Sequence, residues 1–310
     1  MDLFEEMQGA KPFLKWAGGK RQLIPAIQDA LPNNLCHARD LTYVEPFIGG
    51  GAALFWMLQA YPNIRQAIIN DINPDLTTAY QVVQQRPQEL IKALTAIQEF
   101  YYRLPSEVAR RSYFEELRTE FNTRPLEAVR NTAVLMFLNR TCFNGLYRVN
   151  SKGGFNVPFG RYDQPVICHP QTILADSRLL ARVTILQGDF SETINHAPTN
   201  SFFYFDPPYK PLSKTATFNA YATETFDAAS QERLAAFCHE LDAQGSQWLL
   251  SNSDPQNTDA SDCYFDDLYA EFTIRRIQAK RHINSKAAGR GKISELLISN
   301  YALVPEVQLA

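Results

Sequence analysis

The stretch "LTYVEPFIGGGAALFWMLQA" (41–60) joins a short apolar run, a glycine cluster and a helical pattern. A second apolar run, "QAIINDI" (66–72), follows it and also reaches an acid. Short apolar runs bounded by turn residues are typical of strands that are buried on both faces of a parallel sheet. Because two parallel strands need a crossover between them, residues 41–72 predict one βαβ unit and an α/β fold.

The rest of the chain predicts that this sheet is interrupted by a helical insertion. Helical patterns dominate from Pro74 to about Pro125 and continue at 126–140, and "VNSKGGFNVPFGRY" (149–162) predicts a β-hairpin around a Lys-Gly-Gly turn. An insertion of roughly 90 residues is too long for a plain loop. Further strand patterns lie at 182–190, 201–209, 246–254, 269–279 and 293–303, with a helix at 230–241.

Composition narrows the class of protein. The chain has 310 residues, 45% of them hydrophobic, and a formal net charge of −3, so a nucleic-acid partner would need local basic patches. Its five cysteines form no C-x-x-C pair, which favours reduced thiols. The N-terminus has no apolar segment of a signal peptide and no stretch reaches the length of a membrane span. We therefore expect a cytoplasmic protein with no membrane contact.

The glycine-rich turn "EPFIGGGAALF" (45–55) fits a nucleoside ligand. Glycine lets a backbone approach a ligand closely, and Asp71 follows at the end of the next strand, where an acid grips a ribose diol in doubly wound folds. A phosphate-binding loop would need Gly-Lys-Ser/Thr, which is absent. The alternative interpretation is a tight turn, with Asp71 as an ordinary helix cap.

A second glycine-rich turn, "FLKWAGGK" (13–20), carries Lys15, Trp16 and Lys20. Two positive charges and an aromatic ring suit a ligand that has both charge and a π-face. The alternative is a helix start, because helical spacing follows.

The run "SFFYFDPPY" (201–209) places Asp206 at the carboxyl end of a strand, where open α/β sheets have their sites. Pro207 and Pro208 have no N–H and stiffen the turn. A carboxylate beside a fixed carbonyl accepts both protons of an amino group, and Tyr209 offers a flat ring for stacking. The alternative is a strand that simply ends in an Asp-Pro turn.

These motifs resemble a known family. "FLKWAGGK", "EPFIGGG", "NDIN", "GDF" and "DPPY" occur in the order of the α-group DNA adenine methylases, and "FNGLYRVNSKGGFNVPFGRY" (143–162) resembles the DNA-reading hairpin of the Dam-like enzymes that methylate GATC. The resemblance runs from about Phe13 to Tyr301. It implies a Rossmann-like sheet that binds S-adenosylmethionine, transfer of a methyl group to adenine N6 in double-stranded DNA, and flipping of the target base. It also implies a discontinuous catalytic domain (1–73 and 169–310) and a DNA target-recognition domain (74–168).

The resemblance assigns a role to each matching residue. The target adenine would be bound by the catalytic residues Asp206, Pro207 and Tyr209. S-adenosylmethionine would be bound by Trp16, Lys20, Glu45, Phe47, Gly49, Asp71, Asp189, Phe190 and Asp206. DNA would be contacted by Lys15, Phe143, Asn144, Leu146, Arg148, Asn150, Pro158, Arg161 and Tyr162. One branch of the family has tyrosine at the position of Phe143, so this chain keeps the stacking face there and lacks the hydroxyl.

Two stretches without acids support a DNA partner. Residues 139–162 hold four Lys and Arg, and residues 275–292 hold seven. Such runs suit phosphate contacts, although a charge run is also typical of a merely solvated face. The histidines show no metal-ligand spacing. We expect a metal-free protein, a monomer in solution, that associates with the nucleoid when it is bound to DNA.

Two other functions stay open on the sequence. The DPPY motif also occurs in amino-methyltransferases that act on cytosine N4 or on RNA. The motif by itself therefore does not distinguish these targets from adenine N6 in DNA. A non-catalytic DNA-binding module is the second alternative. The intact Asp206 and the intact set of cofactor residues argue against such a module.

Overall fold

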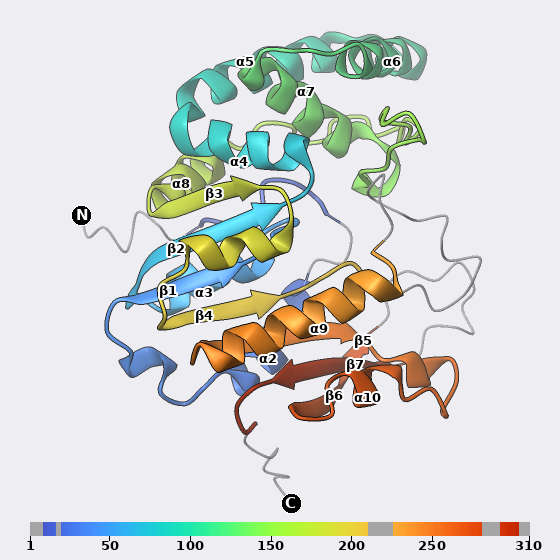
Figure 1. Cartoon of the computed structure of the whole chain (residues 1–310). Coiled ribbons are helices and arrows are strands. Elements are labelled where there is room, and N and C mark those ends of the chain that lie inside the picture. Colours follow the sequence, from blue (N-terminus) through green and yellow to red (C-terminus); the bar gives the residue numbers. More distant parts are fainter. Residues whose placement is uncertain (1–8, 17–19, 210–225, 281–291, 304–310) are drawn as a thin grey trace, which may run out of the picture.

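The computed structural model of the chain describes residues 9–16, 20–209, 226–280 and 292–303. Its seven strands form one sheet in the order β3-β2-β1-β4-β5-β7-β6 (Figure 1). The strands are β1 (Leu41–Glu45), β2 (Ile64–Asp71), β3 (Val183–Gln187), β4 (Ser201–Phe205), β5 (Gln247–Ser253), β6 (Thr273–Lys280) and β7 (Lys292–Ser299). Strands β1 to β5 are parallel, whereas β7 runs antiparallel to both β5 and β6. The predicted mixed α/β fold is confirmed.

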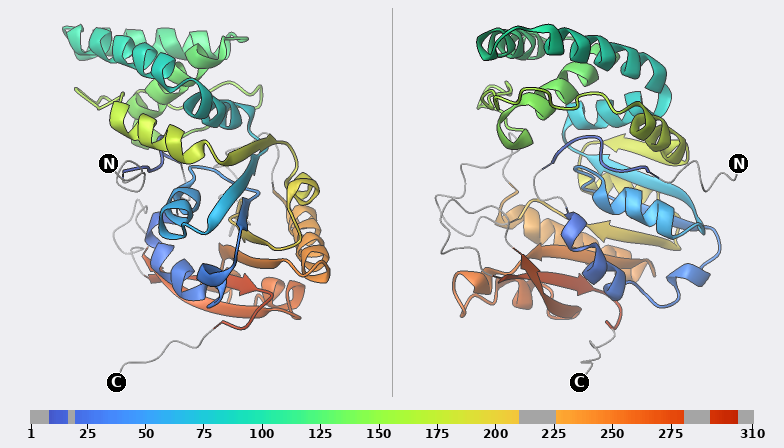
Figure 2. Two further views of the ribbon diagram at one scale, coloured as in Figure 1. Left: turned by 90° about the vertical axis from the view of Figure 1, so that its left-hand side faces the viewer. Right: turned by 180° about the vertical axis from the view of Figure 1, so that it is seen from behind.

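Helices cover both faces of the sheet and extend beyond its β3 edge. They are α2 (Ile24–Ala30), α3 (Ala52–Ala60), α4 (Pro74–Gln85), α5 (Pro87–Arg103), α6 (Glu107–Asn122), α7 (Ala128–Thr141), α8 (Pro170–Leu180), α9 (Ala228–Ala243) and α10 (Tyr264–Leu268). Short 3-10 turns are η1 (Lys20–Gln22), η2 (Leu35–His37), η3 (Phe143–Gly145), η4 (Phe190–His196) and η6 (Pro255–Asn257). Figure 2 shows α2 and α3 on one face and α9 and α10 on the other. Helices α5, α6 and α7 form a separate layer beyond α4 and α8 (Figure 1).

The aromatic run of β4 is buried on both faces of the sheet. Phe202 and Tyr204 belong to the apolar core on the side of α2 and α3. Phe203 and Phe205 belong to the second core, under α9 and α10. Successive side chains of a strand point to opposite faces, so an uninterrupted aromatic run requires both faces to be covered. Because both faces of β4 are covered, its carboxyl end is held in place, and Asp206 directly follows that end.

The helical insertion is the crossover between the neighbouring parallel strands β2 and β3. Asn73 caps α4 by accepting hydrogen bonds from the N–H groups of Asp75 and Leu76, and Pro74 takes the first helical position. Both features are standard helix-start signals. The prediction of helices here is confirmed, but α8 was not predicted from its sequence.

The segment predicted as a β-hairpin forms antiparallel pairing only at two isolated bridges, Cys142 with Phe159 and Val149 with Phe155. Asn150 N donates to Gly154 O at 2.9 Å and Asn156 N donates to Arg148 O at 3.0 Å, so the chain folds back around the Lys-Gly-Gly turn. The predicted hairpin, with short extended pieces on each side of the turn, is confirmed in this short form. The side chain of Asn122 binds the backbone of the hairpin, because its amide accepts from Phe155 N at 2.8 Å and donates to Phe155 O at 3.0 Å.

Within the described ranges, the structure has no helix with the length and apolar character needed to cross a membrane.

Helix α8 carries a fully buried acid, Asp176. Its Oδ1 accepts a hydrogen bond from Lys11 N at 2.9 Å, while Oδ2 has no partner within the described residues. Burial raises the pKa of Asp176 to about 8. Between about pH 4, where an unfolded aspartate titrates, and pH 8, the folded protein therefore binds one proton more than the unfolded chain.

We expect Asp176→Asn to gain stability over the wild type as the pH rises from 5 to 8. In that window, Asp176 should lower the free energy of unfolding of the wild type by up to about 1.4 kcal/mol for each pH unit. The variant should not show this loss, because the asparagine amide cannot titrate. Urea unfolding at four pH values measures the difference, with the exposed Asp29→Asn as a control. A difference between Asp176→Asn and the wild type that stays constant with pH would contradict this assignment.

Candidate active site and DNA-reading face

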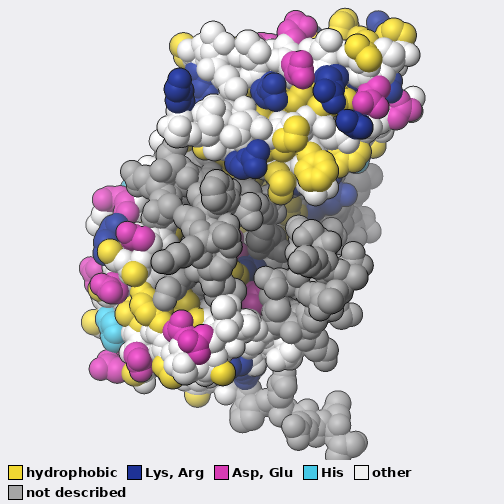
Figure 3. Space-filling view, turned by 90° about the vertical axis from the view of Figure 1, so that its right-hand side faces the viewer, with side chains coloured by type: hydrophobic (Ala, Val, Ile, Leu, Met, Phe, Trp, Pro, Cys, Tyr) yellow, Lys and Arg dark blue, Asp and Glu magenta, His cyan; other side chains and the backbone are white. Residues whose placement is uncertain are grey.

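The carboxyl ends of β1 and β4 lie side by side in the sheet, and the strand order reverses between them. Open α/β sheets bind ligands at such a switch point. Glu45 is the last residue of β1 and Asp206 directly follows β4, so the two acids meet at this edge. Figure 3 looks at the side of the molecule toward which these strand ends point in Figure 1.

A buried ammonium group lies beside Asp206. Lys20 Nζ is 3.1 Å from Asp206 Oδ1, 3.5 Å from Glu295 Oε2 and 3.9 Å from the centroid of the Tyr209 ring. The hydroxyl of Tyr209 donates to the same Glu295 oxygen at 2.8 Å. One cation thus contacts two carboxylates and the face of a ring. The structure therefore brings together Lys20, Asp206 and Tyr209, which the sequence assigned to the site.

The acid of the DPPY motif has further support from the neighbouring strand. Ser251 Oγ lies 3.3 Å from Asp206 Oδ1. Burial raises the pKa of Asp206, the Lys20 ammonium opposes this shift, and the negative charge of Glu295 adds to it. The carbonyl of Pro208 accepts from a glutamine of α9, whereas no hydrogen bond reaches the carbonyl of Pro207 from the part of the chain that the structure describes.

The glycine turn after β1 packs against Trp16 and binds Asp71. Gly49 N donates to Asp71 Oδ2 at 3.2 Å, and Asn73 N donates to Oδ1 at 2.9 Å. A Cβ on Gly49 would lie 3.1 Å from Trp16 Cδ1, and one on Gly50 would lie 3.0 Å from Trp16 Cβ. Burial raises the pKa of Asp71 to about 6, against the lowering effect of its backbone donors. The absence of side chains at the turn is what lets Trp16 lie beside it.

Two aromatic rings and one acid lie next to this turn. The ring centroids of Phe47 and Phe190 are 5.3 Å apart. Asp189 Oδ1 accepts from Ser191 Oγ at 2.6 Å and from Arg233 Nη2 at 2.9 Å. Although burial acts in the opposite direction, these bonds hold the pKa of Asp189 below its ordinary value. The carboxylate is therefore already engaged by the protein on one oxygen.

Lys15 is tied to the insertion by the buried side chain of Asn139. Asn139 Oδ1 accepts from Lys15 N at 2.8 Å, and its Nδ2 donates to the carbonyls of Lys15 and Gly145, both at 2.9 Å. Gly145 has φ of +65°, and a Cβ there would lie 2.3 Å from Lys15 Cδ. The amino group of Lys15 lies 5.8 Å from the centroid of the Tyr162 ring. Asn139 thus joins the N-terminal turn to the start of residues 143–162, the segment that the resemblance predicts to read DNA and that we call the reading segment.

The reading segment presents its first residues to solvent. Phe143 is 53% exposed and its N–H donates to Pro158 O at 2.8 Å. Asn144 is exposed and has a left-handed φ of 56°. Arg148 is half-buried, and its Nε donates to Asn156 Oδ1 at 2.8 Å. These contacts orient the segment from within the loop itself.

Three other residues assigned to DNA have structural contacts of their own. The Asn150 side chain accepts from two N–H groups of its own turn. Arg161 Nε lies 3.6 Å from Glu107 Oε1, and both side chains are exposed. The carbonyl of Tyr162 accepts from Tyr101 Oη at 2.6 Å.

Two arginines of the predicted basic stretches are committed to contacts within the protein. Arg140 donates to a backbone carbonyl of the N-terminal segment at 2.9 Å, and burial lowers its pKa. Arg276 is paired with Asp254 at 3.0 Å and with Asp266 at 2.7 Å. Residues 281–291 of the second stretch lie outside the described residues. In Figure 3, the helical layer carries Lys and Arg together with hydrophobic side chains and Asp and Glu.

Residues 16–283 match the family described as D12 class N6 adenine-specific DNA methyltransferase. The chain belongs to this family. Its enzymatic class is accordingly that of an adenine-specific DNA methyltransferase, as the resemblance predicted.

Named relatives extend the match over almost the whole chain. The type II methyltransferase M.MjaIII of Methanocaldococcus jannaschii is 45% identical, over 94% of this chain and 99% of the relative. The type II methyltransferase M1.LlaDCHI of Lactococcus lactis subsp. cremoris is 38% identical, over 94% and 95%. The DNA adenine methylase of Serratia marcescens is 34% identical, over 94% and 98%.

Sequence reasoning missed residues that complete the methyltransferase site from a distance. Glu295 lies in β7, opposite Ser253 of β5 in the strand pairing. Buried Asn70 donates to the carbonyls of Pro46 and Gly188, and so ties the ends of three strands. The one available signal was an acid inside the apolar run "ISELLIS". Among the residues that the structure describes, no cluster of three or more His, Cys, Asp or Glu could hold a metal ion.

We expect Asn139→Ala to destabilise the methyltransferase by about 1–3 kcal/mol, because the change leaves a buried N–H group and two carbonyls without their partner. Urea unfolding measures the loss. The matched control is Asn195→Ala, which removes an exposed asparagine bonded to Glu192. Equal stability of both variants and the wild type would contradict the linking role of Asn139.

Proposed function

We propose that this enzyme transfers the methyl group of S-adenosylmethionine to the N6 amino group of adenine in duplex GATC, after flipping the base out of the helix. The observation that carries the proposal is the fixed pair of acceptors at the tip of β4, the Asp206 carboxylate and the Pro207 carbonyl. Residues 1–73 and 169–310 would form the Rossmann-like catalytic domain. Residues 74–168 would form the DNA-recognition domain.

The edge of the sheet fits S-adenosylmethionine. The side-chain-free turn at Gly49 and the Asp71 carboxylate suit a ribose diol, and Phe47 and Phe190 suit the two faces of an adenine ring. Glu45 is buried at the end of β1 and accepts from Tyr43 Oη at 2.8 Å; together with Trp16 it would border the methionine part. When bound, the cofactor supplies a methyl group that is electrophilic because its sulfur carries a positive charge.

The chain's own groups would prepare the amine. Asp206 and the carbonyl of Pro207 accept its two N–H bonds, which holds the amino group in one plane and raises the electron density on nitrogen. In the transfer, N6 forms a bond to the methyl carbon while the carbon–sulfur bond breaks toward sulfur. One N6 proton then passes to Asp206, whose raised pKa suits that role.

Lys20 is paired with one oxygen of Asp206. The arriving amine would displace it, and Glu295 at 3.5 Å is the second carboxylate that keeps the ammonium paired. Tyr209, whose hydroxyl is fixed by Glu295, would then stack on the flipped base.

DNA recognition would come from the exposed end of the insertion. Flipping a base costs a few kcal/mol, and the exposed ring of Phe143 would fill the gap, with Asn144 beside it. Leu146 and Arg148 would read the inner bases and Lys15 the outer pair. A bidentate arginine contact to guanine discriminates by about 1–3 kcal/mol.

Methyl transfer from labelled S-adenosylmethionine tests the proposal. Two duplexes of equal composition, one with a single GATC and one scrambled, are incubated with the wild type, Asp206→Ala and the exposed control Asp29→Asn. We expect N6-methyladenine in the GATC duplex alone, with activity lost only in Asp206→Ala. Label in both duplexes would refute the GATC specificity, and label on cytosine N4 or on RNA alone would refute the adenine target.

Glu295→Gln should move the acidic limb of the pH–rate profile to lower pH. The negative charge of Glu295 helps to raise the pKa of Asp206, and the neutral amide removes that contribution, so Asp206 ionises at lower pH. The amide oxygen can still accept from Tyr209. Turnover at saturating DNA and cofactor between pH 5 and 9 measures the limb. A limb that moves to higher pH would contradict the coupling of the two carboxylates.

A further inference from the structure

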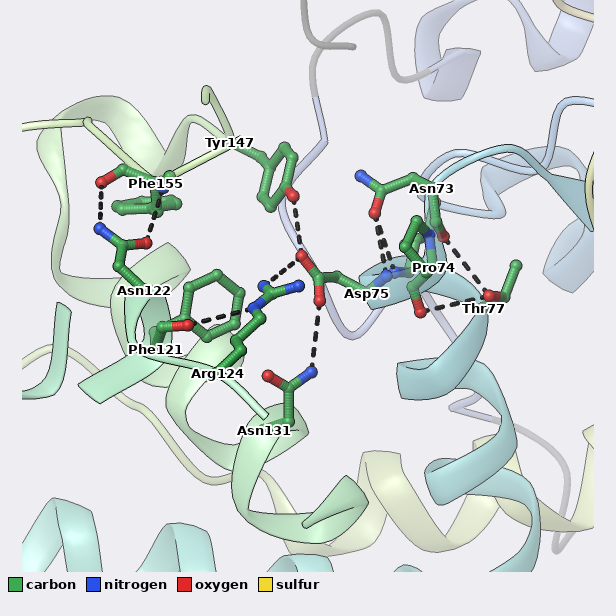
Figure 4. A network of polar contacts seen from close by, with 12 residues as sticks. Asn73, Pro74, Asp75, Thr77, Phe121, Asn122, Arg124, Asn131, Tyr147 and Phe155 are labelled. Carbon is green, nitrogen blue, oxygen red and sulfur yellow. Dashed lines mark hydrogen bonds and ion pairs between the residues drawn. The ribbon is translucent and has the colours of Figure 1, made fainter. Parts of the chain in front are cut away.

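A buried carboxylate at the start of the helical insertion binds the reading segment. Asp75, in the first turn of α4, is 5% exposed. Its Oδ2 accepts from Arg124 Nη2 at 2.5 Å and from Tyr147 Oη at 2.9 Å, and its Oδ1 accepts from Asn131 Nδ2 at 3.3 Å. Figure 4 shows these groups converging on Asp75 from the loop after α6, from α7 and from the reading segment. We call these four residues the Asp75 junction.

The junction begins four residues after the acid proposed to bind the cofactor ribose. Asp71 accepts from Asn73 N at 2.9 Å, and Asn73 in turn caps the helix turn that carries Asp75. A ligand that fixes Asp71 therefore also fixes the backbone at the start of α4.

Tyr147 has a second contact on the cofactor side. Its ring stacks on Trp16, with centroids 5.0 Å apart and planes at 23°, and Trp16 lies against Gly49. The hydroxyl end of Tyr147 thus touches Asp75 while its face touches a residue proposed to contact the cofactor. Tyr147 therefore contacts both the Asp75 junction and the cofactor side.

Leu146 and Arg148 flank Tyr147 in the chain. The backbone of Leu146 is extended, with φ of −76° and ψ of 149°, and its side chain packs against the same apolar core as Tyr147. Tyr147 is buried, whereas Leu146 and Arg148 are half-buried. The position of the Tyr147 ring consequently sets where the two proposed base-reading side chains lie.

We propose that Tyr147 is a positioning residue that couples cofactor binding to reading of the DNA sequence. The proposal rests on the function proposed above. A ligand that orders Trp16 and the start of α4 would hold the Tyr147 ring, and through it Leu146 and Arg148, in the reading position. By linkage, cognate DNA must then tighten cofactor binding by the same factor.

The test measures this factor with S-adenosylhomocysteine as the probe. Calorimetry gives the Kd of S-adenosylhomocysteine for the enzyme in three conditions: without DNA, with a GATC duplex and with a scrambled duplex. Tyr147→Phe keeps the ring and the stack and removes only the bond to Asp75, which retains Arg124 and Asn131. The matched control is Tyr102→Phe, whose exposed hydroxyl donates to Pro165 O at 3.0 Å, away from the junction.

In the wild type and in Tyr102→Phe, we expect the GATC duplex to tighten the Kd of S-adenosylhomocysteine at least fivefold. In Tyr147→Phe the factor should fall toward one, while the Kd without DNA changes less than threefold. Asp75→Asn is a second variant, of nearly equal volume, and should also reduce the factor. If the bond between Tyr147 and Asp75 merely adds stability, the two variants would lower the melting temperature and leave the factor unchanged. That result would overturn the proposal.

The outcomes separate this inference from the proposed function. If the wild type binds S-adenosylhomocysteine and methylates GATC, but Tyr147→Phe keeps the full factor, the coupling role alone is refuted. If the wild type binds no S-adenosylhomocysteine or does not distinguish the two duplexes, the proposed function fails and the coupling role fails with it.

Discussion

The candidate catalytic edge of this methyltransferase depends on one buried ammonium, that of Lys20. Lys20 joins three segments that are distant in sequence: the N-terminal turn, the tip of β4 at Asp206 and the middle of β7 at Glu295. Without that charge, two carboxylates would face each other in a site largely shielded from water, where an uncompensated ion costs several kcal/mol. The antiparallel end of the sheet therefore does more than complete the fold, since β7 delivers the second acid beneath the DPPY turn.

Polar side chains also fix how the helical insertion meets the rest of the chain. One apolar core runs from the sheet into the insertion, but hydrophobic burial has no preferred direction and would tolerate many relative orientations. Asn139 and Asp75 each bind groups from several segments, and hydrogen bonds require specific distances and angles. These buried bonds hold Lys15 and Tyr147 at set positions relative to the strand ends.

The elements that the sequence predicted well are those with a local signal. Asn73 and Pro74 mark the start of α4, and the aromatic run before Asp206 marks a doubly buried strand. The hairpin was predicted from turn chemistry, which is also local, whereas no local signal indicated that the distant Asn122 binds the backbone of Phe155. The same distinction separates the site residues. Glycines, prolines and strand-end acids were visible, whereas Glu295 acquires its partners only when β7 pairs with β5.

The charge balance of the edge fits the proposed reaction. One ammonium and two carboxylates sum to −1 when all three are ionised. In the proposed transfer, S-adenosylmethionine would supply the methyl group, and positive charge would develop on an adenine nitrogen held against Asp206. A site with net negative charge at that end would stabilise this charge, and Asp206 would remove it by accepting the proton. Burial serves this purpose twice, because it strengthens the electrostatic attraction and raises the proton affinity of the acceptor.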